Sequence, residues 1–279
     1  MGAFITCSKV AHDFRRDYQI AASPLMLEIE QRVCCANYGG TSWTTRAQAE
    51  HVVSRLELSP GLRLLEVGGG AGWPGLFLAT QSGCEIVISD LPLEGLRMAR
   101  ERAELDGLAA HCNFVAADGA ALPFRDRSFD RIHHADVLCC MSSKHLMLRE
   151  CRRVARSGAL MAFSVISLAA APSDDEGRRL LQLSGPPYPD AGADYALLLS
   201  KSGWDVIERL DVTAEFARCM GILLDETRAR RAALLALLGE QDFAERLQRR
   251  ESTRASIELG LLKREWFVAS IAIDVDVSE

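Results

Sequence analysis

The chain has 279 residues, and its 32 lysines and arginines against 38 aspartates and glutamates give a formal net charge of −6. Hydrophobic residues make up 48% and charged residues 25%, which is typical of a globular protein and excludes a disordered or fibrous one. The acidic balance offers no long-range attraction for phosphate backbones, and 6% aromatic residues provide few stacking platforms, so we expect no nucleic-acid partner.

Membrane and metal binding are also not expected. The longest apolar stretch, residues 159–172, is interrupted by Ser164 and Ser167 and falls short of the about 20 residues that a membrane span needs. The N-terminus shows no cationic segment followed by an apolar one, so no secretory signal is predicted. Nine cysteines without CxxC spacing indicate reduced thiols. We therefore expect a cytoplasmic protein with no membrane partner and no metal site.

Three helices are predicted first, over residues 8–18, 24–35 and 46–56. Thr45 and Gln48 have the spacing of a capping box at the start of the third helix. The segment YGGTSWTT, residues 38–45, predicts an ordered loop because of its glycines and hydroxyls. We predict an N-terminal helical cap over residues 1–58 and a larger domain over residues 59–279.

From residue 63 the pattern changes to short apolar runs that alternate with segments of helical periodicity. The runs between residues 63 and 166 are RLLEV, EIVIS, NFVAA, FDRIHHA and ALMAFSVI. This alternation is typical of βαβ units and predicts an α/β fold with a mostly parallel sheet covered by helices on both faces. Two later strand-like runs, WDVIERL and REWFVASIAIDV, flank a predicted insertion of two helices at about residues 213–262, with Gly239 between the helices.

The sharpest motif is LLEVGGGAGWPG, at the end of the first predicted strand. Glycine tolerates positive φ and has no side chain, so this backbone can approach a ligand closely. Gly68, Gly70 and Gly72 are spaced GxGxG after Glu66, whereas a dinucleotide fingerprint is GxGxxG and requires no acidic residue before it. A carboxylate there would repel a pyrophosphate and attract an ammonium group. The motif therefore favours a nucleoside with an amino-acid tail over NAD; a tight strand-to-helix turn is the alternative.

Two further acidic residues follow predicted strands. Asp90 ends EIVISD about 20 residues beyond the loop, where a carboxylate can accept hydrogen bonds from both hydroxyls of a ribose. Its alternative role is to cap the next helix. Asp118 and Gly119 follow the third strand, where the carboxylate can accept the exocyclic amine of adenine. An ordinary Asp-Gly turn explains this second pair equally well.

Together these motifs resemble the class I S-adenosylmethionine-dependent methyltransferase family, specifically its small-molecule members. They run in order from Arg63 to Ile166, and residues 194–213 are similar to the family's later helix and strand. The resemblance implies a Rossmann-like, mostly parallel sheet of seven strands with an antiparallel last strand. It also implies that S-adenosylmethionine is the cofactor and S-adenosylhomocysteine the product.

The resemblance also assigns residues to the parts of the cofactor. Glu66 and the loop from Gly68 through Gly70 to Gly72 would hold the methionine moiety, Asp90 the ribose, and Asp118 with Gly119 the adenine. Leu91 would cover one adenine face, and the carbonyl of Ala135 would accept the amine of the cofactor.

A general base is optional for methyl transfer, because the cofactor supplies the leaving group and the protein supplies position and desolvation. His133 and His134 lie near a predicted strand end, and since side chains alternate across a sheet, at most one faces the cleft. We predict His134 as the base with Asp136 behind it; core packing of both histidines is the alternative. Many relatives carry two histidines after the fourth strand, where this chain has Cys139 and Cys140.

Tyr38 and Trp43 are candidates to close over the methionine end, since an aromatic face attracts a sulfonium; ordinary packing is the alternative. The predicted function is methyl transfer from S-adenosylmethionine to nitrogen or oxygen of a small organic acceptor, enclosed between the end of the fourth strand and residues 173–262. Carbon and thiophilic acceptors, and the oligomeric state, stay open. The alternatives are a non-catalytic cofactor-binding partner subunit and an NAD-dependent reductase, although the YxxxK pair of such reductases is missing from the sequence.

Overall fold

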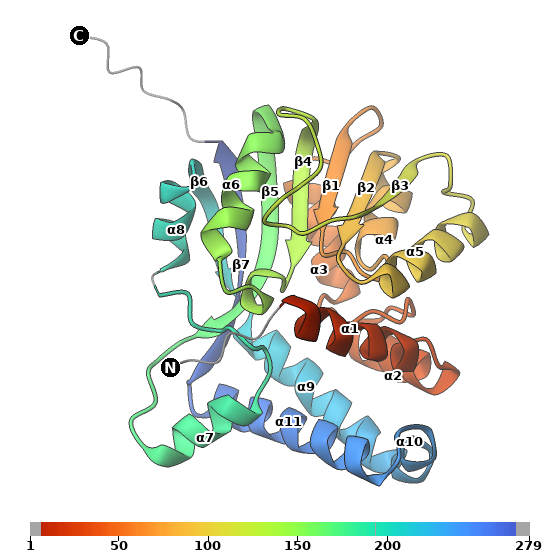
Figure 1. Cartoon of the computed structure of the whole chain (residues 1–279), viewed down its shortest axis with the longest axis vertical. Helices are drawn as coiled ribbons and strands as arrows, with labels where there is room; N and C mark the ends of the chain where they lie inside the picture. The colour runs from red at the N-terminus through yellow and green to blue at the C-terminus, as the bar shows by residue number, and fades with distance from the viewer. Residues whose placement is uncertain (1–6, 193, 272–279) are drawn as a thin grey trace.

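A computed structural model describes residues 7–192 and 194–271 of the chain. Its centre is a seven-stranded sheet in the order β3-β2-β1-β4-β5-β7-β6 (Figure 1). The strands are β1 (Arg63–Val67), β2 (Glu85–Asp90), β3 (Cys112–Ala116), β4 (Phe129–Ala135), β5 (Ala155–Leu168), β6 (Trp204–Asp211) and β7 (Leu262–Ile271). The first five strands pair in parallel, and β7 pairs antiparallel with both β5 and β6. This confirms the predicted seven-stranded, mostly parallel sheet.

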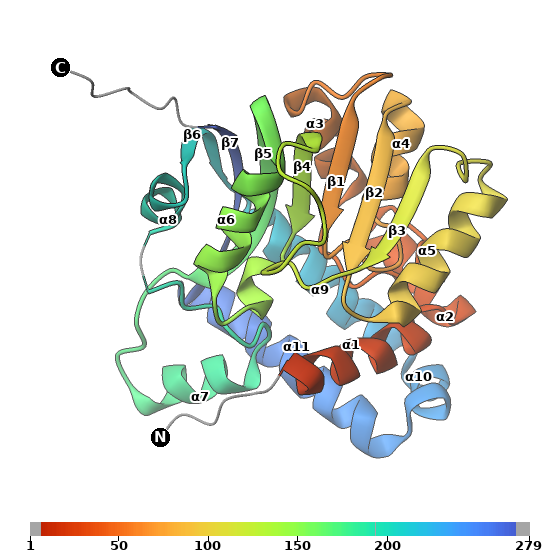
Figure 2. The ribbon, with the colours of Figure 1, turned by 45° about the horizontal axis from the view of Figure 1, so that its top comes forward.

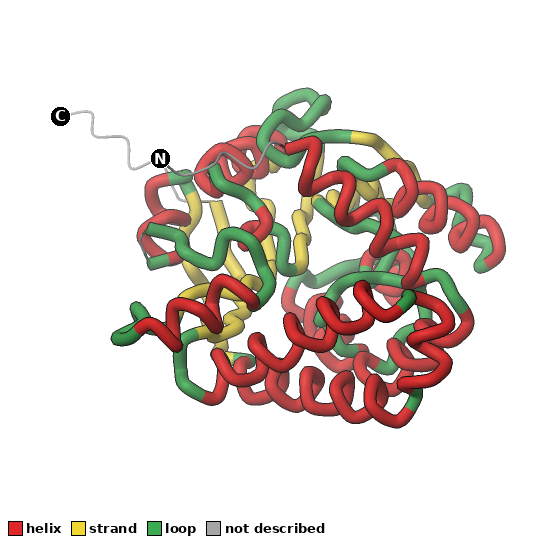
Figure 3. Tube along the Cα trace, turned by 60° about the horizontal axis from the view of Figure 1, so that its bottom comes forward, coloured by secondary structure: helices red, strands yellow, loops and turns green. Residues whose placement is uncertain are grey.

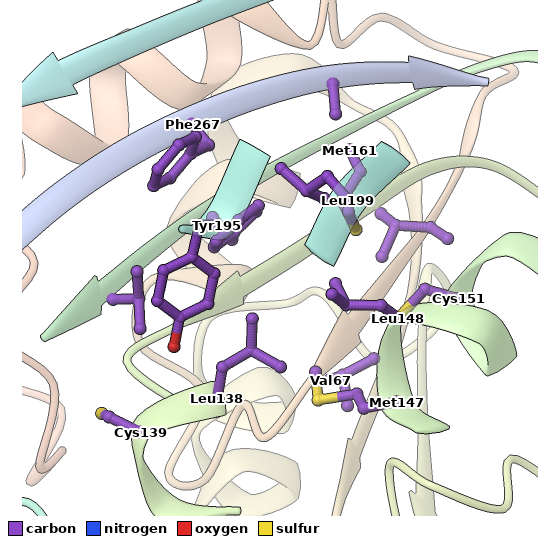
Figure 4. Packing of buried hydrophobic residues seen from close by; sticks show 14 of the residues in the cluster. Val67, Leu138, Cys139, Met147, Leu148, Cys151, Met161, Tyr195, Leu199 and Phe267 are labelled. Carbon is purple, nitrogen blue, oxygen red and sulfur yellow. The ribbon is translucent and has the colours of Figure 1, made fainter. Parts of the chain in front are cut away.

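The strands read as continuous apolar runs because helices cover both faces of the sheet. Neighbouring residues point to opposite faces: Leu64 and Ala162 belong to one buried cluster, and Leu65 and Phe163 to the other. The first cluster is covered by α3 (Arg46–Arg55), α4 (Gly75–Ser82) and α5 (Leu93–Leu105). The second is covered by α6 (Lys144–Val154) and α8 (Tyr195–Lys201), whose packing Figure 4 shows.

The remaining helices gather at the carboxyl edge of the parallel strands (Figures 1 and 3). They are α1 (Cys7–Ala21), α2 (Pro24–Cys34), η1 (Leu138–Cys140), α7 (Asp175–Leu183), α9 (Thr213–Ala229), α10 (Arg231–Leu238) and α11 (Glu240–Glu258). Since open α/β sheets bind ligands at this edge, these helices are placed to cover a site. Within the described residues, no helix is both long and apolar enough to cross a membrane.

The helix boundaries confirm several sequence signals and correct one. Thr45 and Gln48 form the predicted capping box of α3, and Gly239 ends α10 with φ of 79°. The insertion between β6 and β7 holds three helices instead of the predicted two, because the chain leaves helical geometry at Arg230. The boundary of the helical cap near residue 58 stays a prediction. Two of the N-terminal helices pack on helices of the larger predicted domain, α3 on α4 and α2 on α9.

Candidate active site

The glycine loop after β1 has a backbone shape that side chains would not permit. Gly68, Gly70 and Gly72 have φ values of 71°, 49° and 95°, all in the region that favours glycine. A Cβ atom added to Gly68 would lie 2.4 Å from Cγ2 of Val137, and one added to Gly70 would lie 2.2 Å from the hydroxyl oxygen of Tyr18. Glycine is therefore required at these positions, both by the backbone conformation and by the neighbouring side chains of Val137 and Tyr18.

Asp90 lies directly beside this loop. Its Oδ2 accepts hydrogen bonds from the Gly70 amide at 2.7 Å and from the Tyr18 hydroxyl at 3.1 Å, and its Oδ1 accepts from the Leu91 amide at 2.7 Å. Burial raises the pKa of Asp90 to about 6. Among the described residues, no side chain caps α5, whose N-cap is Pro92, so the alternative capping role of Asp90 is not observed. Leu91 is 42% exposed beside it.

Glu66 lies beneath the loop and does not reach its outer surface. The carboxylate is 1% exposed, and its Oε1 is 3.2 Å from Nδ1 of His133. Its Oε2 is buried, has no hydrogen-bond partner among the described residues, and would be 1.6 Å from a Cβ atom on Gly75. In this conformation Glu66 cannot contact a ligand directly, contrary to the expectation that its carboxylate faces the ammonium.

The predicted base, His134, lies in the core. Its side chain is fully buried, and its ring stacks on Phe163 with centroids 4.6 Å apart. Neither ring nitrogen has a hydrogen-bond partner in the described part of the chain, and burial lowers the pKa of His134 well below its usual value. A neutral imidazole without access to the cleft cannot take a proton from an acceptor. In this structure His134 therefore has the core packing of the alternative interpretation, because helices cover both faces of β4.

Asp136 is not behind His134 but pairs with Arg264 of β7. Arg264 is 1% exposed, and its Nε and Nη2 donate to the two carboxylate oxygens of Asp136 at 3.0 and 2.9 Å. The same guanidinium donates to Gln48 of α3 at 3.0 Å and to Ser164 of β5 at 2.9 Å. Asp136 has φ of 56°, which is uncommon for a residue other than glycine. The prediction of a His134–Asp136 pair is thus replaced by a buried ion pair at the carboxyl end of β4.

The other residues predicted to contact the cofactor lie at the same edge of the sheet. Asp118 accepts a hydrogen bond from the Ala120 amide at 2.9 Å, as it would in an ordinary Asp-Gly turn. A Cβ atom added to Gly119 would lie 3.0 Å from Cγ1 of Val67. Ala135 ends β4 opposite Ser164 of β5 and is partly exposed. Asp118, Gly119 and Ala135 are therefore positioned at the edge where the resemblance expects them, with contacts that also suit ordinary turns.

The two aromatic residues predicted to close over the cofactor lie apart and pack on the protein. The Tyr38 ring is 5.2 Å from that of Trp73, and the guanidinium of Arg102 lies 4.5 Å from its centroid. Trp43 meets Phe216 of α9 edge-on at 5.2 Å. These contacts are those of the packing alternative, and the proposed sulfonium contact has no support from them.

Three residues that the sequence did not single out, Tyr18, Glu30 and Arg264, make buried polar contacts. Glu30 of α2 accepts the Gly39 amide at 2.7 Å, and burial raises the pKa of Glu30 to about 7. Tyr18 reaches Asp90 from a helix far away in sequence, so no local pattern could show it. Arg264 does carry a signal, because a charged residue that opens an apolar strand must find a partner when the strand is buried.

The predicted acceptor pocket at the end of β4 does not coincide with a cavity found elsewhere among the described residues. That cavity has about 550 Å³ and lies between α10 and α11, lined by residues such as Arg231, Phe243 and Leu247. It lies away from the glycine loop and Asp90, so we do not assign it to the reaction. The acceptor position stays a prediction.

Comparison with known proteins agrees with this geometry. Residues 65–163 match a methyltransferase domain family. Methyltransferase GfsG from Streptomyces halstedii is 31% identical over 170 residues, which cover 60% of this chain and 61% of GfsG. The chain thus spans less than two thirds of that relative. Other relatives include proteins named as O-methyltransferases and C-methyltransferases.

Solved structures show the same fold at low sequence identity. A phosphoethanolamine N-methyltransferase from Haemonchus contortus, solved with S-adenosylhomocysteine, gives a TM-score of 0.79 at 14% identity and covers 98% of this chain and 62% of that one. The [4+2]-cyclase SpnF gives 0.76 at 20% identity and covers 96% and 97% of the two chains. The fold is therefore shared by proteins named for different reactions.

Proposed function

We propose that the protein is a class I S-adenosylmethionine-dependent methyltransferase that methylates an oxygen or nitrogen atom of a small organic acceptor, because residues 65–163 match a methyltransferase domain family and a named methyltransferase is 31% identical. The cofactor of this family is S-adenosylmethionine. The observation that best supports the proposal is the carboxylate of Asp90 held 2.7 Å from the amide of Gly70. A carboxylate beside a glycine backbone supports the proposal, because the hydroxyls of a ribose can donate to it in a nucleoside with an amino-acid tail.

The residues of the site fit this cofactor. Side chains at Gly68 and Gly70 would collide with Val137 and Tyr18, so these positions require glycine, and the buried carboxyl group of Glu66 lies below the loop with Oε2 unpartnered among the described residues. A carboxylate at this position would favour an ammonium and disfavour a pyrophosphate. We assign the methionine moiety to the loop from Gly68 to Gly72, with the carbonyl of Ala135 as acceptor for the amine.

The other assignments concern the nucleoside. Asp90 would accept the ribose hydroxyls, Leu91 would cover one face of the adenine, and Asp118 with Gly119 would contact its edge. Leu91 suits its role because an exposed aliphatic side chain next to Asp90 can be covered by a ring.

The chain's catalytic contribution is position and exclusion of water. When bound, S-adenosylmethionine would supply an electrophilic methyl group: the acceptor atom would bond to the methyl carbon in line as the carbon–sulfur bond breaks, and S-adenosylhomocysteine would leave with the electron pair of that bond. Burial of His134 removes the candidate base, and the ion pair with Arg264 engages both oxygens of Asp136. An acceptor that is nucleophilic in its neutral form, or that loses its proton to water, fits such a site best. The helices at the carboxyl edge would keep water from the reacting atoms.

Turnover tests the proposal. The protein would be incubated with S-adenosylmethionine and a panel of amines, phenols, carboxylic acids and alkenes, and release of S-adenosylhomocysteine would be measured. We expect release with at least one acceptor that carries nitrogen or oxygen. Release with an alkene or another carbon nucleophile alone would overturn the choice of acceptor atom.

A second candidate is a protein that binds the cofactor without methyl transfer. It is favoured by the lack of a base from His134 and by the fold shared with a protein named as a cyclase. Binding of S-adenosylhomocysteine without turnover on any acceptor would support it. An NAD-dependent reductase would instead bind NAD.

We also propose that the protein is cytoplasmic and that residues 1–58 form a helical cap.

A further inference from the structure

Tyr18 of α1 fills the space beside the carboxylate proposed to hold the ribose. Its side chain is 4% exposed although α1 lies on the outside of the fold, next to α5 (Figure 2). The ring lies against two glycines. A Cβ atom added to Gly70 would be 2.2 Å from the hydroxyl oxygen of Tyr18, and one added to Gly95 would be 2.9 Å from Cε2 of Tyr18. The hydroxyl donates to Oδ2 of Asp90 at 3.1 Å.

The lone pairs of Asp90 show why this contact concerns a ligand. A carboxylate offers about four acceptor positions. The amides of Gly70 and Leu91 take one on each oxygen, and Tyr18 takes the second position on Oδ2. A ribose that binds through both hydroxyls needs one position on each oxygen, so it needs the position that Tyr18 occupies. The ring of Tyr18 also covers Gly70, where the nucleoside would pack.

We propose that Tyr18 is a gate on the cofactor site, which closes the site by bonding to Asp90 and opens when α1 moves away. This inference rests on the proposed function, because it takes Asp90 as the ribose acceptor. Two protein states follow, and the cofactor binds the open one. The apparent dissociation constant then exceeds the intrinsic one by the reciprocal of the open fraction.

The attachment of α1 suits such a movement. Three ion pairs hold its last turns: Arg15 with Glu94 of α5 at 2.9 Å, Arg16 with Asp242 of α11 at 3.1 Å, and Asp17 with Arg246 of α11 at 2.6 Å. The two arginines of α1 are exposed, so their pairs are weak and screened by salt. Only Ala22 and Ser23 separate α1 from α2, so a small change in the backbone torsion angles of these two residues can move α1 relative to α2.

Calorimetric titration with S-adenosylhomocysteine tests the gate. If the closed state is favoured by about tenfold, Tyr18→Phe and Tyr18→Ala should tighten binding up to about tenfold, because the open fraction rises toward one. The matched control is Tyr195→Phe, which removes a buried hydroxyl that makes no hydrogen bond within the described residues and lies away from Asp90. We expect it to bind like the parent protein.

The outcomes separate the gate from the function. Unchanged or weaker binding by both Tyr18 variants, with binding by the parent protein intact, would overturn the gate and leave the proposed function standing. Weaker binding would instead make Tyr18 part of the cofactor-bound site. No binding by the parent protein or any variant would overturn the proposed function and the gate with it. Circular dichroism of each variant would verify that it is folded.

Association kinetics provide a second readout. S-adenosylhomocysteine carries no net charge near neutral pH, so salt has little effect on its diffusional encounter. Because salt weakens the ion pairs of α1, the association rate should rise with ionic strength in the parent protein and stay constant in Tyr18→Ala. A salt-independent rate in the parent protein would contradict a gate held by these pairs.

Discussion

The ion pair between Asp136 and Arg264 gives the sharpest test of the rearranged site. Asp136→Asn would remove the charge that Arg264 faces, while asparagine still tolerates φ of 56°. The guanidinium, 1% exposed, would keep its bonds to Gln48 and Ser164 and lose its counter-ion. Breaking a buried pair by changing one partner costs about 3–5 kcal/mol. For a chain of this size the melting temperature should fall by about 6–20 °C.

Thermal unfolding followed by circular dichroism measures this loss, with Asp126→Asn as the matched control. Asp126 also pairs with an arginine, Arg153, but is exposed, so the free energy of unfolding should change by less than about 1 kcal/mol. Combining Asp136→Asn with Arg264→Met should recover much of the stability, since no unpaired buried charge then remains. Equal effects of Asp136→Asn and Asp126→Asn would refute the reasoning, and so would a double variant that is less stable than Asp136→Asn.

Four further predictions concern the cofactor site and its surroundings. In a Tyr18→Phe background, where the tyrosine no longer competes, Asp90→Ala should weaken binding of S-adenosylhomocysteine by about 1.5–3 kcal/mol; calorimetry showing unchanged affinity would remove Asp90 from the ribose site. Burial raises the pKa of Asp90 to about 6, and hydroxyl donors favour its charged form. The affinity for S-adenosylhomocysteine should therefore be constant above about pH 7 and decrease as the pH falls through 6, with proton release on binding. An affinity that does not change with pH would contradict this. His134→Ala should lower the free energy of unfolding by about 2–5 kcal/mol, because it leaves a cavity in the core. The folded variant should keep its turnover within a few fold of the parent protein, and a 100-fold loss of turnover would indicate that His134 is the base after all. Burial raises the pKa of Glu30 from 4.5 to about 7, so the folded chain binds this proton more tightly than the unfolded chain. The free energy of unfolding should therefore decrease as the pH rises from 4.5 to 7, and denaturant titrations should show a smaller decrease for Glu30→Gln.

Local patterns predicted the sheet and the ligand loop because both are written in neighbouring residues. Short apolar runs between helical segments identify parallel strands, and GxGxG after a strand requires a bare backbone whatever the rest of the chain does. Thr45 with Gln48 fixed the start of α3 for the same reason, since a capping box is complete within four residues.

The catalytic assignments could not be settled this way because they depend on which surface of a strand is open. Alternation shows that His133 and His134 face opposite sides of β4, but it does not show that both sides are covered. Tyr18 meets Asp90 across 72 residues of sequence, and Arg264 meets Asp136 across 128. Such pairings follow from the docking of α1 and the position of β7, which no local pattern contains.

The most direct test of the cofactor assignment is calorimetric titration of the parent protein with S-adenosylhomocysteine and, separately, with NAD. The glycine loop, the buried carboxyl group of Glu66 below it and the proposed ribose acceptor Asp90 predict one S-adenosylhomocysteine bound per chain and no binding of NAD. Binding of NAD without binding of S-adenosylhomocysteine would contradict the account.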